Sequence, residues 1–282
     1  MEKVSSNYLL GSTAAWTASV RALESRREAP LFNDPWAEPL AGEEGMAWIE
    51  TRPTDSVLPI VIRTRYFDDF LQRVTRERAI KQVGLLAAGL DTRAYRLSWP
   101  DGTTIYEVDR PPILERKEEI LDEVNAQATC VRRAVAADLA SDWPEALALA
   151  GFDPRDATVW LLEGILFYLA NETIDSILHT VTGLSAPGSL LGFDIMNDLV
   201  LTSPYTRKWV EMQAELGAPW IGTMNDPQDY LQRLGWEAYL TQAGAEDANF
   251  GRWQLPVLPT LLPGAPHNWY VTAVFTPDRT FS

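Results

Sequence analysis

The sequence predicts an α/β fold with a mostly parallel sheet and helices on both faces. From Gln82 onward, short apolar segments alternate with helical stretches, as expected for parallel strands joined by crossover helices. A glycine turn, AAGLDT at 87–92, follows the first apolar segment and leads directly into a helix start. Such turns bind ligands at the carboxyl ends of parallel strands. The 282 residues suffice for one large domain.

Residues 1–55 are predicted to form a helical cap, because good helix formers are followed by proline and glycine stops. A long helix is expected over 56–80. Its apolar stripe comprises Phe67, Phe70, Leu71 and Val74. Arg63 lies on this stripe, whereas Arg65 faces solvent. A guanidinium carried toward a core needs a carboxylate side chain or a bound anion, so Arg63 is a candidate ligand residue.

Six segments are predicted as strands: QVGLL, TTIYEV, RRAVAA, TVWLL, SLLGFDIM and WYVTAVF. Between the fourth and fifth, ETIDSILHTVTGL has a helical apolar face. Residues 56–196 therefore form the predicted ligand-binding core. The chain then reads as helical and rich in tryptophan and tyrosine, so 197–265 are expected to hold an inserted lid and late sheet elements. Residues 266–282 supply the last strand and tail.

Composition excludes several classes of function. The formal net charge of −15 disfavours nucleic acid and anionic membranes as partners. No segment has the length and apolarity of a membrane span or signal peptide, so a soluble, cytoplasmic protein is expected. One cysteine, Cys130, and two histidines, His179 and His267, argue against disulfides and metal sites. Charge leaves the oligomeric state open.

The glycine turn favours a nucleoside ligand without phosphates. Asp109 ends the next strand, about 20 residues after the turn, where an acid commonly binds ribose hydroxyls. A dinucleotide fingerprint needs three glycines, and AAGLDT has only Gly89. S-adenosylmethionine is a nucleoside ligand of this kind and is therefore preferred over NAD.

Several motifs together resemble the leucine carboxyl methyltransferase family, in its bacterial branch that includes polyketide carboxyl methyltransferases. The motifs are RTRYFDDFL, LLAAGLDTRAYRL, YEVDRP, AADLASDWPEAL and GFDPRDATVWLLEGILFYL. The resemblance covers nearly the whole chain. It implies a class I methyltransferase (Rossmann-like) fold, with N-terminal helices and an inserted helical lid, and S-adenosyl-L-methionine as cofactor.

The resemblance also implies a set of cofactor contacts. Arg63 matches the arginine that holds the cofactor's carboxylate, and Glu163 an acid near its methionine portion. The remaining matches are Ala87 and Gly89 in the turn, Asp109 at the ribose, Asp138 and Leu139 at the adenine, and Tyr168 in the motif of Glu163. Ala87 stands where the family often has glycine, which costs little if its φ is negative. Arg21 is a loose match to a lysine of the eukaryotic members.

Purely structural roles are open to several of these residues. Asp91 and Thr92 are expected to cap the helix that starts at TRAYRL, and Asp109 could cap the following one. Asp138 could be a turn former, and Glu163 could form an internal salt bridge with Arg63. Three tryptophans could either pack in the core of the lid or line the substrate pocket: Trp209, Trp220 and Trp253.

The chemistry that fits best is carboxyl O-methylation. A carboxylate has a pKa near 4 and needs no general base, which suits a chain with so few histidines. We expect a methyl ester to form on a small hydrophobic or aromatic acid of secondary metabolism, polyketide or peptide-derived, without any residue acting as general base. One alternative is a phenol or alcohol O-methyltransferase with His267 as base. The other is a non-catalytic binding module.

Overall fold

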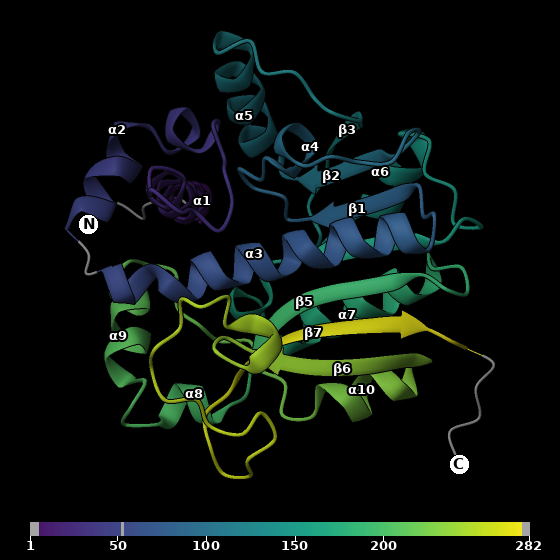
Figure 1. Ribbon diagram of the computed structural model, residues 1–282. Helices are drawn as coiled ribbons and strands as arrows, with labels where there is room; N and C mark the ends of the chain where they lie inside the picture. The colour runs from purple at the N-terminus through teal and green to yellow at the C-terminus, as the bar shows by residue number, and fades with distance from the viewer. Residues whose placement is uncertain (1–5, 52–53, 278–282) are drawn as a thin grey trace.

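The computed structural model describes residues 6–51 and 54–277, and it contains a seven-stranded sheet between two layers of helices (Figure 1). The strand order is β3-β2-β1-β4-β5-β7-β6. The parallel part comprises β1 (Gln82–Leu86), β2 (Thr104–Asp109), β3 (Val131–Ala136), β4 (Thr158–Leu162) and β5 (Leu190–Met196). β7 (Asn268–Phe275) pairs antiparallel with β5 on one side and with β6 (Trp236–Gln242) on the other. The predicted mostly parallel α/β fold is confirmed.

Alternating side chains of the central strands pack into two separate hydrophobic cores, one on each face of the sheet. In β4, Val159 and Leu161 pack against the long helix α3 (Thr54–Glu77), whose apolar stripe was predicted. Trp160 and Leu162 point to the opposite face. That face is covered by α6 (Trp143–Leu149), α7 (Asn171–Gly183) and α10 (Pro227–Arg233). Burial on both faces explains the nearly continuous apolar runs of these strands.

The N-terminal helices form a cap at the carboxyl end of β1 (Figure 1). They are α1 (Ser6–Ser25) and α2 (Ala37–Glu50), and they pack together with Leu90 of the glycine turn and Leu121 of α5 (Pro111–Glu123). The short helix α4 (Arg93–Arg96) follows the turn directly. The cap therefore lies over the strand ends, where ligands bind in folds of this class.

The segment after β5 contains α8 (Leu199–Thr202), α9 (Arg207–Glu215) and α10. The edge strand β6 follows them, within the range 197–265 where late sheet elements were expected. Gly235 has φ 86° and separates α10 from the edge strand β6, which was not among the six predicted strands. Among the described residues there are also two short 3₁₀ turns, η1 (Leu166–Tyr168) and η2 (Glu246–Ala248). Within the described ranges, no helix is both long and apolar enough to cross a bilayer.

Candidate functional site

A cavity of about 320 Å³ lies at the carboxyl ends of β1 to β4, beneath α1. Its walls come from the segments that follow each of these strands, from α3 and from the cap. All eight residues predicted as cofactor contacts line it: Arg63, Ala87, Gly89, Asp109, Asp138, Leu139, Glu163 and Tyr168. Arg21 of α1 lines it as well. Residues from distant parts of the chain thus meet at one edge of the sheet.

The glycine turn has a left-handed backbone at two positions, with φ 53° at Ala87 and φ 51° at Gly89. Ala87 was expected to cost little stability on the condition that its φ is negative, and that expectation is wrong. An alanine in the left-handed conformation costs roughly 1–2 kcal/mol. Gly89 avoids that cost and leaves space beneath the cap. A Cβ there would lie 3.6 Å from Cβ of Ala14.

Asp109 ties the turn to the end of β2. Its Oδ2 accepts a hydrogen bond from the Gly89 amide at 2.6 Å, and its Oδ1 accepts one from the Arg110 amide at 2.7 Å. Burial raises the pKa of Asp109, and the two amides offset this only in part. Each oxygen keeps a lone pair for a further donor. Asp138 is exposed and accepts from the Ala140 amide at 2.9 Å, so it does form the turn that was its structural alternative.

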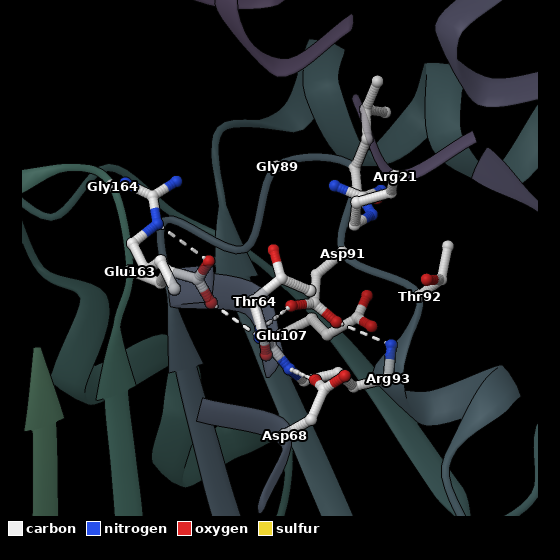
Figure 2. Close-up of polar contacts among 12 residues, drawn as sticks. Arg21, Thr64, Asp68, Gly89, Asp91, Thr92, Arg93, Glu107, Glu163 and Gly164 are labelled. Carbon is white, nitrogen blue, oxygen red and sulfur yellow. Dashed lines mark hydrogen bonds and ion pairs between the residues drawn. The ribbon is translucent and has the colours of Figure 1, made fainter. Parts of the chain in front are cut away.

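Glu163 emerges from the end of β4 and pairs with two arginines, of which Arg93 is labelled in Figure 2. Its Oε1 accepts from Nε of Arg63 at 3.0 Å, and its Oε2 accepts from Nη2 of Arg93 at 2.6 Å. Burial alone would raise the pKa of Glu163, but the charges of Arg93 and Arg63 outweigh it and hold the pKa below its usual range. The anticipated internal salt bridge with Arg63 is therefore present.

Arg63 makes a second ion pair, from Nη1 to Oδ2 of Asp194 in β5 at 2.8 Å. Its third guanidinium nitrogen, Nη2, has no hydrogen-bond partner within the described part of the chain. The side chain of Arg63 is 12% exposed and lines the cavity, whereas that of Arg65 is 34% exposed and pairs with Asp69. The helical stripe therefore placed the two arginines on the correct sides.

A network of buried ion pairs extends from this site, and sequence reasoning missed it. Arg93 contacts three carboxylates, those of Asp68, Asp91 and Glu163 (Figure 2). Arg96 joins the network through Asp68 at 2.6 Å. Two arginines one helical turn apart in TRAYRL, next to a buried turn, were the available signal, because a buried guanidinium requires buried acids.

The predicted caps of α4 are confirmed only in part. Asp91 accepts from the Arg93 amide at 2.6 Å, which supports its structural role. Thr92 does not cap; its hydroxyl donates to Asp34 at 2.6 Å, and Asp34 also pairs with Arg21 at 2.8 Å. Asp109 likewise does not cap α5 with its side chain.

The candidate base and the aromatic lid residues lie elsewhere. Among the residues that the structure describes, neither His267 nor any of Trp209, Trp220 and Trp253 lines the cavity. His267 is 4% exposed, with Nδ1 at 3.2 Å from Oε1 of Gln242 and Nε2 at 3.0 Å from the Leu262 carbonyl. The imidazole thus serves the loop-to-strand junction, and the geometry does not support its role as a base.

The cavity suits a ligand with a nucleoside and a charged amino-acid end. Arg63 offers an anion its Nη2, which lacks a partner among the described residues, and Asp109 offers acceptors to hydroxyl groups. Apolar side chains of Ile113 and Leu139 line the wall near Asp109 and Asp138. These residue types match the chemical groups of S-adenosylmethionine, so the cavity fits this cofactor.

Comparisons with known proteins agree with this architecture. Residues 14–182 match the model of the leucine carboxyl methyltransferase family. A Mycolicibacterium smegmatis protein named as an S-adenosyl-L-methionine-dependent methyltransferase is 38% identical over 268 residues, covering 88% of this chain and 89% of its own. One from Mycobacterium marinum with a similar name is 39% identical over 262 residues, covering 80% of each chain. A Thermobifida fusca crystal structure described as a methyltransferase has a TM-score of 0.57 at 18% identity, covering 93% of this chain and 94% of its own.

Proposed function

Since the chain belongs to the leucine carboxyl methyltransferase family and is an S-adenosylmethionine-dependent methyltransferase, we propose that it methylates a carboxylate. The acceptor is a small hydrophobic or aromatic acid of secondary metabolism, polyketide or peptide-derived, and the product is its methyl ester. The relatives' names identify an enzyme, so the alternative of a non-catalytic module is set aside.

The observation that carries this proposal is the absence of a suitable base around the cavity. Its described lining contains no histidine, lysine or cysteine. Asp91 and Glu163 are ion-paired with arginines, Asp109 accepts two backbone amides, and Asp138 accepts the Ala140 amide within its own turn. Burial raises the pKa of Tyr168, so its phenol stays protonated. An acceptor that is ionised at neutral pH needs no base, whereas a phenol or alcohol does.

The residues around the cavity would hold the cofactor along its length. We propose that Nη2 of Arg63 binds the carboxylate, that Asp109 binds the ribose, and that Asp138 and Leu139 contact the adenine. Ala87 and Gly89 give the backbone its approach, and Glu163 and Tyr168 lie at the methionine portion. When bound, the cofactor supplies an electrophilic methyl group on a sulfonium.

The chain's own contribution is orientation and exclusion of water. Apolar side chains line the wall near Glu163 and Tyr168, and we propose that they receive the apolar part of the acceptor: Ile60, Leu169 and Ile177. Holding the acceptor carboxylate in line with the methyl group removes much of the entropic barrier. A dry site also strengthens the nucleophile, because its hydration shell is lost.

Labelled methyl transfer tests the proposal. The protein is incubated with S-adenosylmethionine carrying a ¹⁴C-methyl group and with arylalkanoic acids, each matched by its primary alcohol and by a phenol of similar size. We expect label only with acids, and mild alkali should release it as volatile methanol, since esters hydrolyse and ethers do not. Label that enters phenols or alcohols and resists alkali would refute carboxyl methylation.

A further inference from the structure

Asp194 is a fully buried acid that does not itself line the cavity. It lies in β5, beside the strand that carries Glu163, and both of its oxygens have a partner. Oδ2 accepts from Nη1 of Arg63 at 2.8 Å, and Oδ1 accepts from the Gly164 amide at 2.6 Å. The Asp194 carboxylate thus holds both Arg63 and the backbone at Gly164. Gly164 directly follows Glu163, the other partner of Arg63.

Gly164 holds the same guanidinium by close approach. It has φ 74°, and a Cβ there would lie 2.9 Å from Nη2 of Arg63 and 3.1 Å from its Nη1. No side chain larger than hydrogen fits between this backbone and the guanidinium without displacing it. The Gly164 backbone is itself positioned by Asp194, so the two contacts act on Arg63 together.

These contacts leave one nitrogen for a ligand. An arginine usually binds a carboxylate through two nitrogens at once. Here Nε is engaged by Glu163 and Nη1 by Asp194, and only Nη2 lacks a partner among the described residues. The orientation of that nitrogen depends on Asp194, because Glu163 alone would let the guanidinium pivot about its single contact at Nε.

We propose that Asp194 is a positioning residue for the methyl donor: it orients Arg63 so that Nη2 binds the carboxylate of the donor's amino-acid portion. This inference rests on the proposed cofactor contacts of Arg63. Asp194 acts only through Arg63 and Gly164, so its influence is confined to the amino-acid end. The nucleoside end depends on Asp109, which Asp194 does not contact.

Two ligands separate these ends. S-adenosylhomocysteine has the carboxylate, and 5′-methylthioadenosine has the same nucleoside without it. For Asp194→Asn, whose single amide oxygen cannot accept from both partners, calorimetry should show a loss of S-adenosylhomocysteine affinity of about ten- to a hundredfold, the size of a charged hydrogen bond. The affinity for 5′-methylthioadenosine should stay within about twofold, since no contact to the nucleoside changes.

Glu107→Gln is the matched control. Glu107 is another fully buried acid, paired with Lys117 at 2.7 Å and Arg132 at 2.8 Å, and it does not line the cavity. Its replacement should change neither affinity. Gly164→Ala is the second variant: it leaves the Asp194 charge in place and displaces the guanidinium from the other side, so it should show the same selective loss.

Three results would overturn the proposal. Asp194→Asn could bind S-adenosylhomocysteine as tightly as wild type, in which case Arg63 does not depend on it. It could lose both ligands equally, which is the signature of a purely structural role. Gly164→Ala could leave both affinities unchanged. If wild-type protein bound 5′-methylthioadenosine and S-adenosylhomocysteine equally well, the proposed contact of Arg63 with the carboxylate would be refuted instead. If wild-type protein bound neither ligand, the proposed cofactor site itself would be refuted.

Discussion

Ala87 carries a methyl group at a position whose backbone is left-handed, with φ 53°. Glycine adopts this conformation without the steric cost, although it loses more entropy on folding. We expect Ala87→Gly to raise the free energy of unfolding by about 0.5–1 kcal/mol in urea titrations. Ala79 has the same φ of 53° and lies outside the cavity, so Ala79→Gly should stabilise to a similar extent. A destabilised Ala87→Gly protein would contradict the strain.

Asp91 should make the fold sensitive to acid. Burial raises its pKa, but Arg93 and other nearby cations outweigh this and lower the pKa to about 2. Because the unfolded value is near 3.9, the folded state binds fewer protons over this range, so the stabilisation is complete above about pH 5 and is lost as the pH falls toward 2.

The size of this effect follows from the same shift. The stability difference between wild type and Asp91→Asn should shrink by about 2–3 kcal/mol between pH 5 and pH 2, measured by chemical denaturation at each pH. Glu145→Gln, at an exposed acid of α6, should follow the wild-type profile throughout. A pH-independent difference for Asp91→Asn would show that Asp91 does not titrate below its usual range.

Single residues were predictable where a local pattern carried the information. Arg63 was placed on the buried side by the helical stripe of α3 alone. Its salt bridge with Glu163 was anticipated as a structural alternative. Its pair with Asp194, 131 positions away along the chain, was not, and neither was the pair of Glu163 with Arg93, 70 positions away. Ion pairs between distant segments leave no periodic signal, and the conformation of Ala87 depends on how the turn meets the cap.

At the scale of elements, the segment after β5 holds η1 in place. The amides of Ile221 and Gly222 donate to the Phe167 carbonyl at 2.8 and 3.1 Å, and the Thr223 amide donates to Asn171 at 3.0 Å. A Cβ on Gly222 would meet the Leu166 carbonyl oxygen and lie 2.5 Å from that of Leu169. The segment after β5 therefore contacts η1, the turn that carries the cavity residue Tyr168.

This contact predicts a large effect of one methyl group. Gly222→Ala should lower the free energy of unfolding by about 1–3 kcal/mol, because the methyl group cannot fit against fixed backbone. Gly183→Ala is the control: Gly183 ends α7 and has open space around it, so it should be neutral or gain up to about 1 kcal/mol of stability. Thermal unfolding measures both substitutions. Equal effects would argue against close packing of Gly222 on the backbone of η1.

The elements themselves were predicted unevenly. The buried strands β1 and β4 coincide with the segments QVGLL and TVWLL, since burial on both faces demands unbroken apolar runs. The edge strand β6 exposes Glu237 and Tyr239, so its sequence lacks such a run and was not among the six predicted segments. Lid core and substrate lining were both open for the tryptophans; Trp220 packs on Phe167 of η1, and Trp209, Trp220 and Trp253 are all absent from the described lining of the cavity.

At the scale of the whole molecule, the fold gathers chemistry from across the chain at one edge. The order of the strands brings the ends of β1, β2, β3 and β4 side by side, and α1 and α3 close the space above them. The alternation of strands and helices was enough to predict this edge as the site. The ion pairs of Arg63 with Asp194 and of Glu163 with Arg93 emerge only from the packed structure.

The most direct test of the account is a crystal structure of the protein with S-adenosylhomocysteine. We expect the ligand in the cavity at the ends of β1 to β4, with its ribose on Asp109 and its carboxylate on Nη2 of Arg63. Arg63 should keep its pairs with Glu163 and Asp194. A ligand bound outside this cavity, or one that touches neither Asp109 nor Arg63, would contradict the assignment of the site.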